Sequence, residues 1–239
     1  MPSGKEIEQL IERQAKFWEV RKRLSDEGGE AARQALAHLG EGPWITVSKQ
    51  WGSGGVELAQ RIGEEMGWQV FDREILIAIS ENTKMKQTVL SRMDERAIGA
   101  FNDYIVQLLV PSDPGQLTYT REMVRVIWGI ARQGNAVIVG RGANWILDPL
   151  YGLRIRVMAP LAHRLERLPG ATEKEVRKRD AEQVSFIQRV YDKRIDDPEG
   201  YDLMLNMQSM DFETAVDVVM AALRKKLLAR GQVFTSYNS

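Results

Sequence analysis

The apolar positions of this chain fall into short runs that alternate with helical patterns. Residues 45–47 form a β-branched run that predicts a buried strand, and a glycine-rich turn follows at 52–55. From 56 to 66, apolar residues recur at helical spacing. Gly67 is expected to end that helix, and residues 68–71 to form a second strand. The pattern predicts a unit of strand, glycine loop, helix and strand.

The rest of the chain continues in the same way. Further strands are predicted at 136–139, 153–158 and 201–206. Helical patterns separate them, at about 73–110, 119–133, up to 167, 172–194 and 212–230. Because the strands are apolar along their length and alternate with helices, they predict an α/β fold with a parallel five-stranded sheet covered by helices on both faces.

The first forty residues carry a different pattern. Two amphipathic helices are expected at 5–24 and about 30–39, separated by a glycine pair. We interpret 1–40 as a helical extension that packs on the main domain or on a second subunit; in the second case these helices would mediate self-association as a homo-oligomer. The main domain is then 41–239, with a largely helical insertion at about 73–134.

Composition narrows the possible partners. Lys and Arg number 33, as do Asp and Glu, so the formal net charge is zero. This balance argues against nucleic acid or an anionic membrane as a partner held by bulk charge. The first residues are polar, and no apolar run approaches the ~20 residues that span a bilayer. A soluble, cytoplasmic protein is expected.

The glycine loop points to a phosphate ligand. Glycines allow successive backbone N–H groups to converge on one point, and the helix that follows directs its positive end there. In a parallel sheet, ligands bind beyond the carboxyl ends of the strands. The segments expected at that edge are 52–55, 72–73, 140–142 and Asn206.

Two kinds of nucleotide-binding protein open with such a unit. Gly52 and Gly54 fit the dinucleotide fingerprint GxGxxG, and Asp72 lies at a suitable distance for the ribose. However, Glu57 takes the position of the third glycine, where close packing needs a small residue. About sixty largely helical residues also precede the strand at 136–139. A nucleoside-monophosphate kinase uses such an insertion to hold its acceptor, so the kinase is favoured over a dinucleotide-dependent enzyme.

Several segments resemble the cytidylate kinase-like family, in the family's order. They are ITVSKQWGSGGVELAQRIGEEMGWQVFDREIL, VIVGRGANWIL, RIRVMAPLAHRLERL, KRDAEQVSFIQRVY and DPEGYDLMLNM, and the resemblance covers roughly residues 44–225. It implies a P-loop kinase-type fold with an acceptor-binding insertion and a mobile lid. It also implies phosphoryl transfer from ATP to a nucleoside monophosphate such as CMP, with Mg²⁺.

The resemblance also implies roles for individual residues. Gly52, Ser53, Gly54 and Gly55 would hold the donor phosphates, with Val56 and Glu57 at the start of the helix beside them. Asp72 and Arg73 would lie on the acceptor side, and Arg141 would grip the acceptor phosphate. Within a lid at about 172–194, the residues closest to the family pattern are Arg177, Arg179 and Asp180.

The chain lacks cationic residues at several positions where P-loop kinases usually carry them. In a standard P-loop, GxxxxGK[ST], the lysine reaches the β/γ-phosphates and the hydroxyl holds Mg²⁺. Aligned to a typical CMP kinase, this chain puts Gly55 at the lysine position and Glu57 at the hydroxyl position. Val56 and Gln183 stand where family members often carry arginine. These losses motivate an alternative function: a nucleotide-binding protein with a degenerate P-loop and little or no kinase activity, acting through regulation or partners. Lys49 could compensate, or be a solvated lysine at a strand end.

Other residues keep two interpretations. Asp72 could cap the helix that follows it. Glu57 could be a favourable acid in a first helical turn or a ligand of Mg²⁺. Arg141 could be a surface arginine at a turn. His38 and His163 have no partner constellation, and we expect them to be structural.

Overall fold

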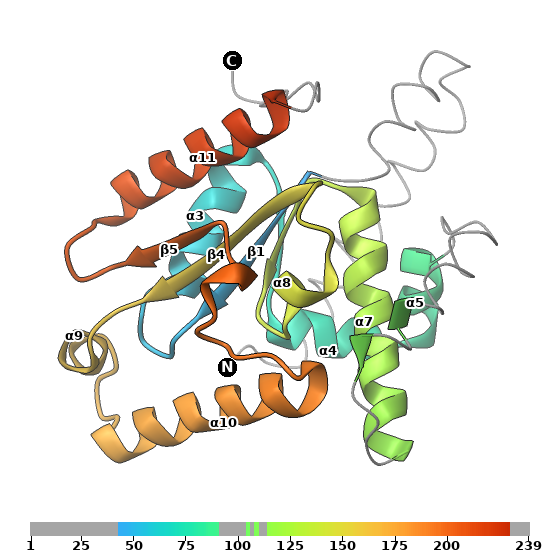
Figure 1. The fold of residues 1–239 in the computed structure, drawn as a ribbon, viewed down its shortest axis with the longest axis horizontal. Coiled ribbons are helices and arrows are strands. Elements are labelled where there is room, and N and C mark those ends of the chain that lie inside the picture. The colour runs from blue at the N-terminus through green and yellow to red at the C-terminus, as the bar shows by residue number, and fades with distance from the viewer. Residues whose placement is uncertain (1–42, 91–103, 106–107, 110–113, 230–239) are drawn as a thin grey trace.

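A five-stranded, all-parallel sheet forms the centre of the protein. The computed structural model describes residues 43–90, 104–105, 108–109 and 114–229. The strands follow the spatial order β2-β3-β1-β4-β5 (Figure 1). They are β1 (Trp44–Lys49), β2 (Gln69–Phe71), β3 (Ala136–Val139), β4 (Gly152–Met158) and β5 (Leu203–Asn206). The predicted α/β class and parallel five-stranded sheet are confirmed.

The sheet order decides between the two nucleotide-binding alternatives. Strand β1 pairs with β3 on one side and β4 on the other, while β2 pairs only with β3 among the described strands. In a dinucleotide-binding fold, the second strand lies directly beside the first. The insertion of β3 between β1 and β2 therefore contradicts the dinucleotide alternative.

Helices cover both faces of the sheet. They are α3 (Gly55–Met66), α4 (Arg73–Glu81), α5 (Thr83–Leu90), α7 (Pro114–Gln133), α8 (Ala143–Ile146), α9 (Leu161–Glu166), α10 (Glu173–Tyr191) and α11 (Phe212–Leu228), with a short 3-10 turn at Pro198–Gly200. Within the described residues, no helix is long and apolar enough to cross a bilayer.

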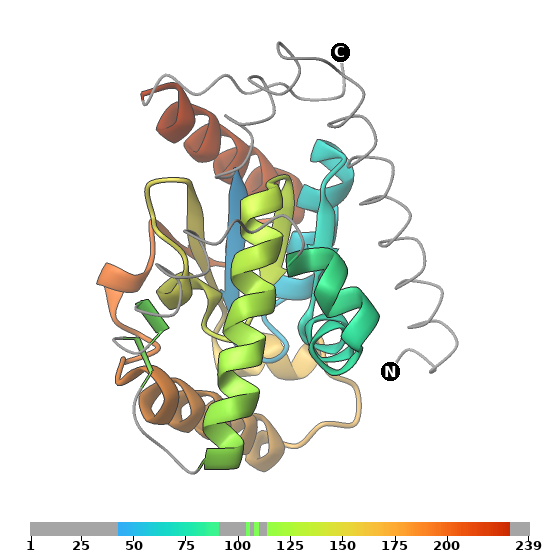
Figure 2. The same cartoon turned by 90° about the vertical axis from the view of Figure 1, so that its right-hand side faces the viewer.

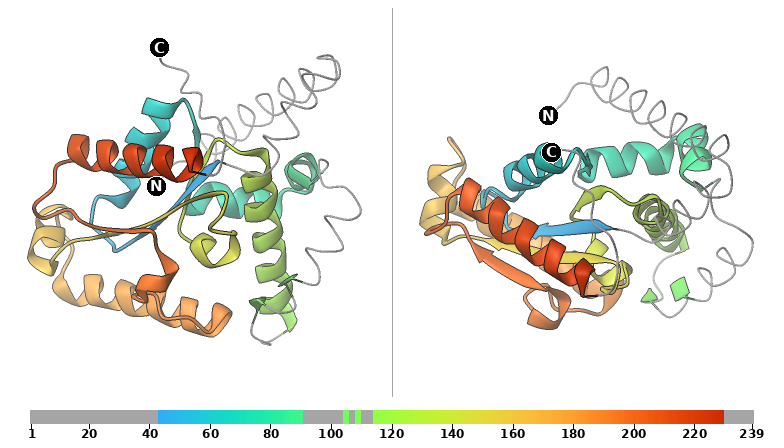
Figure 3. Two further views of the ribbon diagram at one scale, coloured as in Figure 1. Left: turned by 45° about the horizontal axis from the view of Figure 1, so that its top comes forward. Right: turned by 90° about the horizontal axis from the view of Figure 1, so that it is seen from above.

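Successive side chains of a strand point to opposite faces of the sheet, and they contribute to two apolar clusters. Ile45 and Val47 on β1 join the cluster beneath α3 and α11. Trp44 and Ile138 join the cluster formed with α4, α7 and α8 on the other face. Figure 2 shows α7 in front of the sheet, away from α11. Helices α9 and α10 lie near the edge where β1 and β4 end (Figure 3). Helix α10 therefore borders one side of that edge.

Some element boundaries differ from the sequence expectation. The helical region expected from 73 is broken at Asn82, the C-cap of α4, before α5 begins. Helix α7 begins at Pro114, inside the expected break, since proline is well tolerated in a first helical turn. Strand β5 begins at Leu203, because Tyr201 ends the 3-10 turn and its backbone N–H donates to the Pro198 carbonyl instead of to a neighbouring strand. The extension expected at 1–40 lies outside the described residues.

Thr172 and Glu175 have the three-residue spacing of a capping box, and the start of α10 forms one. The Thr172 hydroxyl accepts the Glu175 N–H at 3.3 Å, and the Glu175 carboxylate accepts the Thr172 N–H at 2.7 Å. We expect Thr172→Ala to lower the free energy of unfolding by about 1 kcal/mol, because one helix N–H loses its partner. Urea denaturation measures this loss. Ser185→Ala, at an exposed mid-helix position of α10, is the matched control and should cost nothing; a Thr172→Ala protein as stable as the wild type would contradict the expectation.

Candidate functional site

The chain turns tightly between β1 and α3. Gly52 and Gly54 have φ of 82° and 83°, a region that favours glycine. A Cβ on Gly52 would also lie 2.8 Å from the Arg164 carbonyl oxygen, so the loop is pressed against α9. Gly54 is the N-cap of α3 and supplies no side-chain cap. The first N–H groups of α3 are thus without a capping side chain, as an anion-binding helix start requires.

Ser53 shapes this loop from the inside. Its side chain is fully buried, and its hydroxyl lies within hydrogen-bond distance of the Gln50 carbonyl at 2.8 Å and the Val157 carbonyl at 3.1 Å. Its backbone N–H also donates to the Gln50 carbonyl. Both donors of Ser53 are therefore used within the protein. Ser53 therefore fastens the loop to β4.

A cavity of about 200 Å³ opens beside the loop. Its wall includes Gly54, Gly55 and Val56, together with Lys49 from β1 and Arg167 from the end of α9. A space of this size accommodates a polyphosphate rather than a whole nucleotide. The cavity thus joins the start of α3 to two cationic side chains.

Glu57 lies at the mouth of this cavity and is held by two arginines. Its carboxylate accepts hydrogen bonds from Arg61 at 3.1 Å and from Arg167 at 2.7 Å. Both guanidinium groups also lie over the Phe212 ring, 4.9 and 5.1 Å from its centroid. Desolvation acts to raise the pKa of Glu57, but the hydrogen bonds from Arg61 and Arg167 outweigh it and lower the pKa. With both oxygens engaged, Glu57 is not arranged as a metal ligand.

Lys49 is not a solvated lysine. It ends β1, is partly buried, and lines the cavity. Desolvation lowers the pKa of its ammonium, and the charges that act on it are those of Glu74, Arg179, Arg73 and Asp72. The Lys49 ammonium at the end of β1 thus experiences charges from the start of α4 and from the middle of α10.

Arg141 follows β3 in a left-handed turn. It has φ of 55° between two glycines that are also left-handed. The Tyr191 hydroxyl of α10 donates to the Arg141 carbonyl at 2.7 Å and fixes this turn. The guanidinium lies 5.6 Å from the Phe186 ring centroid and donates to the Tyr119 hydroxyl at 3.5 Å. Desolvation lowers the pKa of Arg141.

This placement distinguishes Arg141 from a surface arginine at a turn. Aromatic side chains of α7 and α10 hold it, and its buried Nε has no hydrogen-bond partner in the described part of the chain. Arg73 and Glu74 are among the charges that act on it, as they do on Lys49. Arg141 and the glycine loop therefore border the same charged region.

Asp72 is the N-cap of α4. Its carboxylate accepts the Ile75 N–H at 3.0 Å, which confirms the capping interpretation. Burial raises the pKa of Asp72. Arg73, the first residue of α4, is exposed and faces the same charge cluster as Lys49 and Arg141. A role of either residue toward an acceptor stays a prediction.

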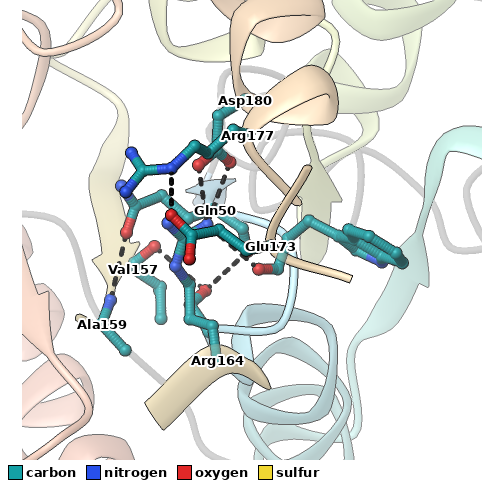
Figure 4. A network of polar contacts seen from close by, with 9 residues as sticks. Gln50, Val157, Ala159, Arg164, Glu173, Arg177 and Asp180 are labelled. Carbon is teal, nitrogen blue, oxygen red and sulfur yellow. Dashed lines mark hydrogen bonds and ion pairs between the residues drawn. The ribbon is translucent and has the colours of Figure 1, made fainter. Parts of the chain in front are cut away.

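Two of the three residues predicted on α10 are linked to Trp51, the residue before the glycine loop: Arg179 directly, and Asp180 through Arg164. Asp180 accepts from Arg164 with both oxygens, at 3.0 and 2.8 Å, and Arg164 also donates to the Trp51 carbonyl (Figure 4). Arg179 lies 4.2 Å from the centroid of the Trp51 ring. Arg177 instead pairs with Glu173 on its own helix, and 67% of its side chain is exposed.

Three residues of the site were not singled out from the sequence: Trp51, Glu74 and Arg164. Arg164 is only 5% exposed, yet nothing in the sequence distinguishes it from Arg167. Its partner Asp180 lies 16 residues further along the chain, so only the fold shows the pair.

The Mg²⁺ expected with ATP is not assigned to protein ligands. No cluster of three His, Cys, Asp or Glu side chains suited to a metal occurs in the described ranges. Mg²⁺ is commonly held by nucleotide phosphates, waters and one or two carboxylates. The ion stays an expectation that accompanies the nucleotide, and no step below depends on it.

Comparison with known proteins shows the family. The model of the cytidylate kinase-like family matches residues 44–209, which include the glycine loop, Arg141 and α10. The chain belongs to the cytidylate kinase-like family. Membership of this family and the sheet order confirm the P-loop kinase-type fold. No curated protein matches the chain.

One solved structure shares the fold, and others are similar to a lower degree. An uncharacterized protein from Eubacterium ventriosum ATCC 27560 is 20% identical with a TM-score of 0.60, over 77% of this chain and 99% of that one. The shikimate kinase from Bacteroides thetaiotaomicron is 14% identical, with a TM-score of 0.43 over 78% and 98% of the two chains. The gluconokinase from Sinorhizobium meliloti 1021 is also 14% identical, with a TM-score of 0.42 over 80% and 95%. The similarity to the two kinases is too low to carry a conclusion about substrates.

Proposed function

We propose that this member of the cytidylate kinase-like family transfers a phosphoryl group from ATP to a nucleoside monophosphate of the cytidylate type. One observation carries the proposal. The glycine loop after β1 and Arg141 after β3 follow adjacent parallel strands, and both border the charge cluster around Glu74. Donor and acceptor phosphates bound at these two places would meet at the same edge of the sheet.

Each part of the site has a task in such a transfer. The N–H groups at the start of α3 bind the donor phosphates. Arg141 holds the acceptor phosphate with two parallel N–H donors. An oxygen of the acceptor then attacks the γ-phosphorus as the bond to ADP breaks. The protein contributes by positioning and by neutralising charge, and α10 excludes water from the reacting groups.

The direct test is turnover of purified protein with ATP and a panel of nucleoside monophosphates. We expect diphosphate products, with the highest kcat/KM for CMP or dCMP, measured by separating the nucleotides after the reaction. Heat-denatured protein and an Arg141→Met variant are the controls for contaminating kinases. Absence of turnover across the whole panel would contradict the proposal.

Two observations favour a second candidate, a nucleotide-binding protein with little kinase activity. The cavity is lined by Val56 where related proteins carry a cation, and Glu57 already pairs with Arg167 at its mouth. This candidate predicts nucleotide binding by calorimetry without phosphoryl transfer, and action through partners or regulation.

Restoring the missing cations separates the two candidates. In Val56→Arg/Gln183→Arg, we expect kcat to rise by roughly 10-fold or more, because a supplied arginine stabilises the charge of the transferring group. Val56→Met/Gln183→Met is the control of similar bulk and should bring no gain. A double arginine variant that binds ATP but is no faster than the wild type would show that charge at these positions does not limit the rate.

A further inference from the structure

Compared with a standard P-loop, this segment has its lysine and its first glycine in exchanged positions. In GxxxxGK, a glycine opens the motif and a lysine follows its second glycine. Residues 49–55 read KQWGSGG, so Lys49 stands at the first glycine and Gly55 at the lysine, while Gly54 keeps its place. The motif therefore keeps its cation, but at the first position, 49, instead of the last, 55.

The structure explains why lysine at position 49 occurs together with glycine at position 55. A Cβ on Gly55 would lie 2.6 Å from the Lys49 Cβ and 3.3 Å from its Cδ. The Lys49 side chain therefore runs along Gly55 and fills the space that a side chain there would need. The Lys49 Cβ is fixed to β1 and cannot move aside. Lysine at 49 and a side chain at 55 exclude each other in this backbone.

The charge of Lys49 is available to a ligand. Glu74 acts on it most strongly among the neighbouring charges, but the ion pairs found in the described residues do not include Lys49. Arg179 and Arg73 add positive charge beside it, and Asp72 adds a second negative charge. A partly buried ammonium that forms no ion pair keeps part of its desolvation cost, which a phosphate entering the cavity would offset.

We propose that the Lys49 ammonium binds the β- and γ-phosphates of the donor nucleotide, the task that the P-loop lysine performs from position 55 in a standard motif. The inference rests on the proposed function, since it names a residue of the same site. Gly55 is then required as glycine so that the Lys49 side chain can pass over the start of α3.

Binding measurements test the role of Lys49. In Lys49→Met, which keeps most of the side-chain length, we expect ATP affinity to fall by at least ~10-fold in calorimetry, because a hydrogen bond to a charged group is lost. AMP, which lacks the β- and γ-phosphates, should lose much less. Lys49→Arg should retain most of the affinity for ATP. Lys225→Met, on the exposed surface of α11, is the matched control and should bind as the wild type does.

Relocating the lysine tests the exchange itself. Lys49→Gly should weaken ATP binding, and Gly55→Lys alone should lower Tm without a gain, because the two side chains collide. The combined variant recreates GxxxxGK, and we expect it to regain most of the ATP affinity that Lys49→Gly lost. Glycine in a strand weakens it, so the combined variant could fail to fold. In that case, the ATP affinities of Lys49→Met and Lys49→Arg decide whether Lys49 binds the phosphates.

The outcomes separate this inference from the proposed function. A wild-type protein that phosphorylates a monophosphate, with Lys49→Met binding ATP equally well, would overturn the inference and leave the function standing. A wild-type protein that neither binds ATP nor turns it over would overturn both. A combined variant that folds but binds ATP no better than Lys49→Gly would also overturn the inference.

Discussion

Replacing Arg141 with methionine is expected to lower kcat/KM for the nucleoside monophosphate by roughly 10²- to 10³-fold, the size seen when one positioned donor is removed from a reacting anion. Arg141 is half-buried, its Nε has no hydrogen-bond partner in the described residues, and aromatic side chains hold its guanidinium. Methionine has a similar length, so it removes the charge and the donors while largely preserving the packing. Initial rates over a range of monophosphate concentrations measure the effect.

Two further variants show whether charge or geometry matters at this position. Arg141→Lys keeps the charge but cannot donate two parallel hydrogen bonds, so we expect it to recover only part of the loss. Arg189→Met, on the exposed face of α10, removes a cation elsewhere and should leave the rate unchanged. If Arg141→Met turned over at the wild-type rate, Arg141 would have no place in the acceptor site.

Replacing Asp180 with asparagine is expected to lower the free energy of unfolding by about 3 kcal/mol, because removing one partner leaves a buried charge unpaired. Arg164 is almost wholly buried, with 6% of its side chain exposed, and Asp180 is its only ion-pair partner among the described residues. The loss should be at the lower end of the range for buried pairs, since 26% of Asp180 is exposed. Urea denaturation monitored by circular dichroism measures it.

The same helix offers a control for this prediction. Lys178 and Glu182 form an exposed ion pair at 3.9 Å, so Glu182→Gln should change stability by less than about 0.5 kcal/mol. Pairing Asp180→Asn with Arg164→Met should recover part of the loss, because no buried charge then remains unpaired. An Asp180→Asn protein as stable as Glu182→Gln would show that the Arg164–Asp180 pair does not hold α10 in place.

The strands and several helix caps could be predicted from the sequence because their signals are local. Ala136–Val139 is a run of four buried apolar residues between two turns, and the predicted bounds are those of β3. Asp211 caps α11 through the Thr214 N–H, and an aspartate directly before a helical apolar pattern is a typical N-cap. The glycine loop was predicted for the same reason, since its turn depends on adjacent residues.

The parts that could not be predicted depend on residues that meet only in the fold. The sequence left Lys49 with two interpretations, because its surroundings come from segments far apart in the chain: Gly55 of α3 lies along its side chain, and charges of α4 and α10 act on it. Arg177 and Arg179 are two residues apart on one charged helix, and only the packing of α10 shows that Arg179 faces Trp51 while Arg177 faces solvent. Segment 1–40, proposed for self-association, stays untested.

The contacts of α10 have a consequence for how the two halves of the site can open. In its first half, Asp180 pairs with Arg164, which donates to the Trp51 carbonyl, and Arg179 lies over the Trp51 ring. At its last residue, Tyr191 donates to the Arg141 carbonyl. A displacement of α10 would therefore disturb both the segment before the glycine loop and the turn that carries Arg141.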